Sequence, residues 1–194
     1  YSLRNTISVG DASIGAAQYS GIQQPIEGYN VADFAFGTAS AKTVTISFWV
    51  KATQAGTYSL CIHNSTANRL CWKTFTVNNT GGTVGWEYKT LTFTGDTSGS
   101  WDTTNGLGLM VYFLFALGSN YSGGSDGVWN TQYYGPSGMS NAIGSNGNIY
   151  AVTGVQLEVG SIATPFERRQ YGQELALCQR YYYRAAVDAA NRTF

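Results

Sequence analysis

The chain has 194 residues, a formal net charge of zero and 11% charged residues, and so lacks the basic excess that a nucleic-acid-binding protein normally carries. The length suits one large domain, or one domain with an appendage. Aromatic residues make up 14%, and 24 glycines against three prolines, with abundant Thr and Ser, indicate an all-β fold. No apolar run is long enough for a membrane-spanning helix, and no signal peptide is recognisable, so we expect no membrane insertion.

The N-terminal part is polar and mixed. Residues 1–24 contain spaced Ile and Val residues, which predict edge strands. Residues 26–30 are expected to form a turn, in which Gly28 is able to adopt positive φ. Residues 31–36 are predicted to form a short helical turn or a strand.

A series of strands follows. Residues 44–50 alternate strictly between apolar and polar side chains and form the clearest predicted strand. Residues 58–62, 72–77 and 86–93 continue the pattern, with turn segments between them. Residues 107–117 are apolar at both odd- and even-numbered positions, that is, on both parities of the strand. This pattern predicts a central strand covered on both faces. We expect the C-terminal helix or another subunit to cover its second face, because an uncovered apolar strand would aggregate.

The segment from Gly118 to Asn148 is a long connection without a strand or helix pattern. Connections of this length are usually functional or disordered. Its aromatic residues argue against disorder, because disordered segments are poor in such residues. We therefore expect an ordered loop that is packed by its own rings.

Residues 149–159 form the predicted closing strand. The apolar parity changes at Thr153–Gly154, which predicts a β-bulge there. Short regular strands without a helix before the end predict a jelly-roll-like β-sandwich over residues 1–160. Residues 161–182 are predicted to form a Pro165-containing connector and a short amphipathic helix. Residues 183–194 are interpreted as a linker or the start of a further domain.

Catalytic and metal-binding patterns are weak. His63 is the sole histidine, lacks a recognisable nucleophile motif nearby and is expected to be a solvent-exposed loop residue. Asp96, Asp102 and Asp126 fall in predicted loops, where turn-forming and capping roles are favoured over a glycosidase pair. We predict that the chain is not an enzyme and holds no metal or cofactor.

The three cysteines do not suggest a disulfide framework. Cys61 and Cys71 flank a polar loop and could face each other across a hairpin. Cys61 shares its strand parity with Ser59, whereas Cys71 shares its parity with Phe75. This difference in parity argues against a bridge.

Several loop residues have the chemistry of a sugar-binding site. Sugar rings stack on aromatic side chains, and sugar hydroxyls pair with amide and carboxylate groups. Alternatively, these rings pack the loop itself or a subunit interface. The candidate glycan-binding residues are Trp101, Tyr121, Trp129, Tyr133, Tyr134, Asp126 and Asn130.

Several segments resemble one known family. Near the C-terminus these are Val155-Gln-Leu-Glu-Val-Gly160, Ala163-Thr-Pro-Phe-Glu167 and Glu174-Leu-Ala-Leu-Cys-Gln-Arg-Tyr-Tyr182. Residues 26–33, 45–50 and 95–106 provide further matches, so the resemblance covers roughly residues 20 to 183. Together they resemble a domain of bacteriophage tail-fibre and other virion structural proteins.

The resemblance implies a virion location, a homotrimer, other virion proteins as partners and adhesion to a host-surface glycan. Leu175, Cys178 and Tyr182 then pack around a three-fold axis; alternatively they cap the sandwich. More loosely, the strand series looks like the jelly roll of carbohydrate-binding modules. Those modules often hold calcium near an Asp of the closing strand, where this chain has Thr153 and Gly154, and no metal is predicted.

Three functions remain open at this point. The chain is a tail-fibre adhesion module, an architectural virion or capsid-decoration module without a ligand, or the carbohydrate-binding module of a polysaccharide-degrading protein.

Overall fold

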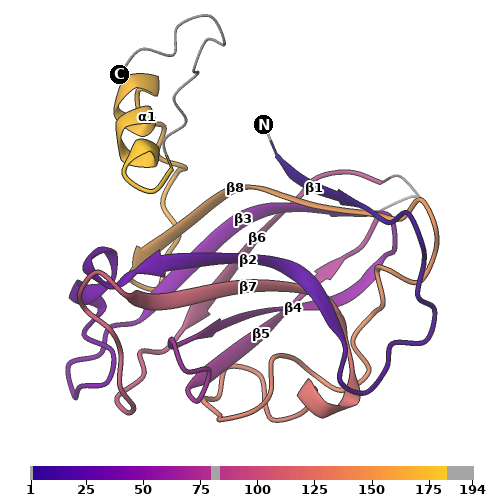
Figure 1. The fold of residues 1–194 in the computed structure, drawn as a ribbon, viewed down its shortest axis with the longest axis horizontal. Coiled ribbons are helices and arrows are strands. Elements are labelled where there is room, and N and C mark those ends of the chain that lie inside the picture. The colour runs from indigo at the N-terminus through magenta and orange to yellow at the C-terminus, as the bar shows by residue number, and fades with distance from the viewer. Residues whose placement is uncertain (1, 80–83, 183–194) are drawn as a thin grey trace, which may run out of the picture. The chain divides into compact units, whose positions relative to one another are not determined.

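The computed structural model describes residues 2–79 and 84–182 and contains eight strands in two four-stranded sheets (Figure 1). All strand pairs are antiparallel. The predicted all-β sandwich is therefore confirmed. The strands are β1 (Leu3–Thr6), β2 (Tyr19–Glu27), β3 (Val44–Ala52), β4 (Gly56–His63), β5 (Leu70–Val77), β6 (Glu87–Phe93), β7 (Leu107–Leu117) and β8 (Ile149–Val159).

The strand order is that of a jelly roll. One sheet has the order β1-β8-β3-β6 and the other the order β2-β7-β4-β5. The pairs β1–β8, β2–β7, β3–β6 and β4–β5 are nested, as if one long hairpin were wound into a two-layered barrel. β1 and β2 lie at sheet edges, as the polar N-terminal sequence predicts.

Alternating side chains of both sheets fill the space between them. On β3 the inward side chains from Val44 to Ala52 are completely buried. The Phe48 ring meets Phe75 and Phe113 edge-on, with centroids 5.2 and 4.9 Å away. Aromatic pairs prefer this geometry, and it ties the two sheets together across the core.

The predicted bulge lies in β8. Ser47 pairs with Gln156, and Trp49 pairs with Thr153. The chain therefore advances three residues on β8 where it advances two on β3. Gly154 lies in the extra segment with φ 56°, a conformation that favours glycine. The change of parity in the sequence therefore marks the bulge correctly.

Gly28 does not adopt the positive φ that a glycine allows. Gly28 begins a 3₁₀ helix, Gly28–Asn30, and is not among the residues with positive φ. It needs to lack a side chain because backbone lies against it: a Cβ there would be 2.5 Å from the Asp102 carbonyl oxygen. A second 3₁₀ helix, Ala32–Phe34, provides the helical turn expected between residues 31 and 36.

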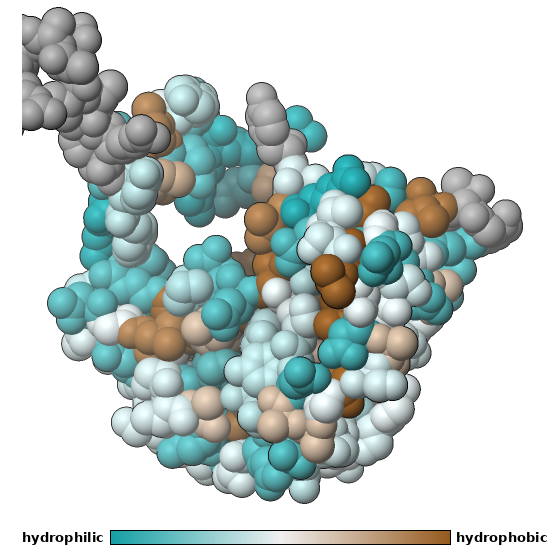
Figure 2. Space-filling model, turned by 45° about the vertical axis from the view of Figure 1, so that its right-hand side comes forward, coloured by the Kyte–Doolittle hydropathy of each residue, from teal (hydrophilic) through white to brown (hydrophobic). Residues whose placement is uncertain are grey.

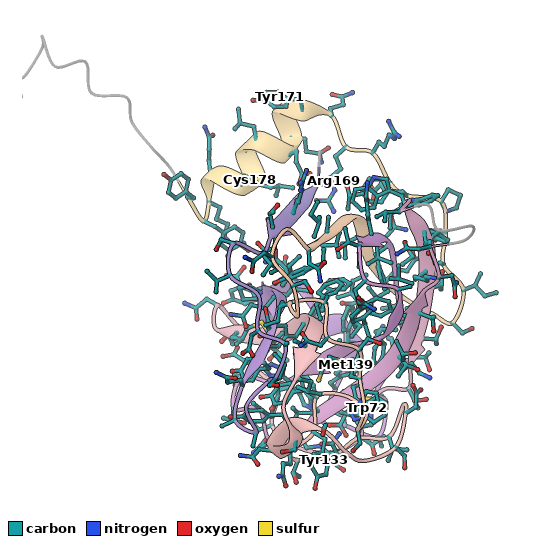
Figure 3. The ribbon with its side chains drawn as sticks, turned by 90° about the vertical axis from the view of Figure 1, so that its right-hand side faces the viewer. Trp72, Tyr133, Met139, Arg169, Tyr171 and Cys178 are labelled. Carbon is teal, nitrogen blue, oxygen red and sulfur yellow. The ribbon has the colours of Figure 1, made fainter. Side chains whose placement is uncertain are left out.

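β7 is covered on both faces, as predicted, and its outer face is covered by a segment that the sequence pattern did not indicate. Apart from its two ends and Met110, β7 is buried along its whole length. Its outer face belongs to a second apolar cluster with Cys61, Leu70 and Trp72. Residues of the loop 118–148 pack on this cluster. Figure 3 shows two of them, Tyr133 and Met139, in the same region as Trp72.

The described residues divide into two units, one up to residue 164 and the other from residue 165 to 182. The second unit contains the predicted helix, α1 (Tyr171–Gln179), whose nine residues are all exposed, including Leu175 and Cys178. Tyr182 follows it and is also exposed. The interpretation of residues 183–194 lies outside the described residues. Among the described residues, no helix is long and apolar enough to cross a membrane.

Neighbouring residues on β3 provide a test of the two-layered core. Phe48→Ala removes a fully buried ring and is expected to lower the free energy of unfolding by about 3–5 kcal/mol. Trp49→Ala, on the opposite face and 43% exposed, is expected to cost well under half of that. Urea denaturation measures both, and equal losses would contradict the assigned faces of β3.

Candidate functional site

The predicted glycan-binding residues do not form one site. Trp101 and Trp129 meet edge-on at 5.6 Å between ring centroids, and both lie against Phe36. The indole N–H of Trp101 donates to the Ser98 carbonyl at 3.1 Å, and that of Trp129 donates to the Thr94 carbonyl at 2.9 Å. Both rings thus hold loops together at one end of the sandwich.

An ion pair supports this tryptophan cluster. Arg69 forms a bidentate ion pair with Asp96 through one edge of its guanidinium, with Nε–Oδ2 and Nη2–Oδ1 distances of 2.7 and 2.6 Å. The Asp96 side chain is 2% exposed, and the paired carboxylate raises the pKa of Arg69. The Arg69 guanidinium also lies 6.0 Å from the Trp129 ring. Asp96 is therefore a buried structural anchor, more than the turn residue that the sequence suggested.

Tyr121 and Tyr134 form a second cluster, which lies over β2 and β7. Both rings lie within 6.0 Å of the Tyr19 ring, and Tyr134 also contacts Tyr112 at 6.3 Å between centroids. The two loop rings meet edge-on at 5.9 Å. Tyr133 lies on the nearby Gly123. The expectation that the loop is packed by its own rings is confirmed, with the sheet surface as an additional partner.

The polar candidates fasten the loop to β5. The Asn130 amide donates to the carbonyls of Leu70 and Tyr133, and its oxygen accepts two backbone N–H groups. Asp126 accepts hydrogen bonds from the Thr74 N–H and hydroxyl, at 2.8 and 3.0 Å, and pairs with Lys73. Partial burial raises the pKa of Asp126, but these donors outweigh it, and the pKa is lowered overall.

The expectation for His63 is wrong. His63 ends β4 and is buried, with 8% of its surface exposed. Its Nδ1 donates to the Asn64 carbonyl oxygen at 2.7 Å, and the Tyr134 ring meets the imidazole edge-on. Burial lowers the pKa of His63. The sequence misplaced it because the hairpin looks polar, whereas the long loop covers this end of it.

Exposed aromatic rings gather elsewhere, on the outer face of the β1-β8-β3-β6 sheet. Trp49 on β3 and Tyr88 on β6 are directly paired across the strands and are 43% and 48% exposed. Their ring centroids are 5.4 Å apart, with 52° between the planes. Trp86, just before β6, is 40% exposed. We call these three residues the aromatic platform.

The strand registers fix what surrounds the platform. Side chains alternate between the two faces of a strand, so residues paired across strands lie in rows. The row with the rings contains Thr153, Trp49 and Tyr88, and the next row contains Arg4, Ala151 and Lys51.

A hollow of about 230 Å³ lies in the second row, lined by Ser2, Arg4, Lys51, Trp86, Ile149 and Ala151. Figure 2 shows, on the face that it presents, apolar side chains in small separate groups among polar ones.

The sequence contained a signal for this platform. Trp49 occupies the polar parity of its strand, with Thr45 and Ser47, and Tyr88 shares its parity with Thr90. A large ring on the polar parity of a half-buried strand must lie on the outer face. The loop aromatics attracted attention because loops often carry function, yet they are the rings that the fold uses internally.

The remaining candidates carry little chemistry. Among the described residues, no group of three or more His, Cys, Asp or Glu side chains is placed to hold a metal ion. Asp102 accepts hydrogen bonds from the N–H and hydroxyl of Thr104, which is a turn role. All three cysteines are free, and Cys61 and Cys71 belong to different apolar clusters, in agreement with the parity argument.

Comparison of the chain with protein-family models, curated proteins and solved structures gave no match in any of the three.

The cysteines test the loop cover. Cys178 is exposed and is expected to react at once with a thiol reagent, while Cys61 and Cys71 stay protected. Burial raises the pKa of Cys71 to about 12 and also that of Cys61, so both remain protonated. Tyr134→Ala weakens the cover and is expected to expose Cys61 but not Cys71.

Mass spectrometry of alkylated peptides reads out each cysteine separately. Tyr29→Ala, which removes an exposed ring remote in sequence from this loop, is the control and leaves all protection unchanged. Labelling of Cys71 before Cys61 in Tyr134→Ala would contradict a cover formed by the loop.

Proposed function

We propose that the chain is a non-enzymatic module of a bacteriophage virion, from a tail fibre or similar appendage, that binds a host-surface glycan. The observation that carries the binding part is the aromatic platform on an otherwise polar sheet face. Three exposed aromatic rings in one place are unusual, because leaving apolar ring surface in contact with water costs free energy. Each ring offers the flat, CH-complementary surface on which a sugar stacks.

The geometry of the platform suits a soluble, curved sugar chain. The planes of Trp49 and Tyr88 are inclined by 52°, so together they present a bent surface. A flat crystalline polymer would need coplanar rings. Thr90 is exposed and lies two residues along β6 from Tyr88, on the same face. Its hydroxyl supplies the polar contact that fixes the orientation of the sugar.

The resemblance of the C-terminal segments supports the virion part of the proposal. A tail-fibre module works as a trimer, joined to other virion proteins. Leu175, Cys178 and Tyr182 are exposed around α1 and are available for packing around a three-fold axis.

A purely architectural role is the second candidate. This role is supported by the loop 118–148, because its aromatic and polar side chains pack the loop against the sheet and fasten it there. On this alternative the platform contacts another virion protein and no sugar.

Binding measurements separate the two candidates. The purified 194-residue chain is applied to a glycan array and to host cells, beside Trp49→Ala, Tyr88→Ala and Tyr29→Ala variants. We expect wild-type binding, a loss of about fivefold or more for Trp49→Ala and Tyr88→Ala, since one lost stacking contact costs about 1 kcal/mol or more, and no loss for Tyr29→Ala.

The absence of any glycan or cell binding by the wild-type chain would leave the architectural role. Full binding by Trp49→Ala would show that the platform is not the glycan site.

A further inference from the structure

The hollow beside the platform contains two positive charges. Arg4 and Lys51 both line it, and their strands lie on either side of β8. Each residue is paired in register with Ala151. Two strand spacings place their Cα atoms roughly 10 Å apart, with the small Ala151 as the floor between them.

These two cations differ from others of the sandwich. Arg69, Lys73 and Lys89 are each paired with a carboxylate. Arg4 and Lys51 have no carboxylate partner within the described part of the chain, although the chain has as many acidic as basic residues. Lys51 is also half-buried, so its ammonium is held near the hollow.

The acidic residue on the same sheet face lies further away. Glu158 is near the other end of β8, beyond the bulge, and its carboxylate accepts hydrogen bonds from Gln156 and Thr164. The face is therefore positive at the end with the aromatic platform.

Resting on the proposed glycan binding, we infer that the ligand contains an acidic sugar, whose carboxylate binds between Arg4 and Lys51. Trp86 lines the same hollow and supplies a ring face for that sugar. Trp49 and Tyr88, one row further on, then take the neighbouring sugar of the chain.

The size and the charges favour this ligand. About 230 Å³ is less than the roughly 300–1,000 Å³ of sites for drug-sized molecules, so the hollow suits a single sugar or its charged substituent. A guanidinium binds a carboxylate through two parallel hydrogen bonds, and an ammonium opposite it adds a point charge. Two cations in a local hollow are far fewer than the basic surface that a nucleic acid requires.

The test compares matched sugars. Calorimetry measures the affinity of the chain for oligogalacturonate, hyaluronan oligosaccharides and oligosialic acid, each beside its carboxyl-reduced, neutral form. We expect at least one acidic form to bind about tenfold more tightly than its neutral form at low salt, and the difference to shrink as salt screens the charges.

The variants are Arg4→Gln, Lys51→Gln and Trp49→Ala, with Lys42→Gln as a control that removes an exposed lysine just before β3. Arg4→Gln and Lys51→Gln are expected to lower the affinity for the acidic form to about that for the neutral form, and so to abolish the preference. Trp49→Ala is expected to weaken both forms, and Lys42→Gln neither. Unchanged melting temperatures confirm that each variant is folded.

The outcomes separate this inference from the proposed function. Equal affinity for acidic and neutral forms, or an unchanged preference in both charge variants, overturns the acidic sugar while glycan binding stands. No binding of any sugar overturns both. Inorganic phosphate or duplex DNA that binds as tightly as the acidic sugar, with loss in Lys51→Gln, would show a general anion site and also overturn the inference.

Discussion

The structure depends on one strand that must be buried on both faces. β7 is apolar on both parities, so one face fills the core between the sheets and the other needs a separate cover. The loop 118–148 follows β7 directly and provides that cover, with Tyr133, Tyr134 and Met139 on the outer apolar cluster. Asn130 and Asp126 then have to fasten the loop to β5. The aromatic content of the loop is thus a consequence of burying β7.

This constraint makes the two outer faces of the sandwich different. The β2-β7-β4-β5 sheet carries the long loop, whereas the β1-β8-β3-β6 sheet presents Trp49, Tyr88 and Trp86 with 40% or more of each side chain exposed. The rings of the covered sheet lower the free energy of folding, while those of the open sheet lie where a ligand can reach them. A binding function therefore belongs to the sheet whose rings the fold does not need.

Sequence patterns predicted much of this architecture because strand periodicity is local. The alternation on β3, the double parity of β7 and the change of phase at Gly154 each appear within a few residues. The pattern could not show which segment covers β7, since that depends on where a distant loop returns. His63 was misplaced for the same reason. The crowding at Gly28 could not be predicted either, because it comes from Asp102, far along the chain. The platform was predictable in part, because Trp49 stands on the polar parity of its strand.

The indole N–H signals of the five tryptophans test the central claim most directly. In a nitrogen-15 correlation spectrum, titration with the acidic oligosaccharide is expected to shift the signals of Trp49 and Trp86. Trp72, Trp101 and Trp129 donate their indole N–H groups to backbone carbonyls of Gly123, Ser98 and Thr94, and their signals are expected to stay in place. Shifts of Trp101 and Trp129 with Trp49 unmoved would place the ligand at the loops and contradict the account.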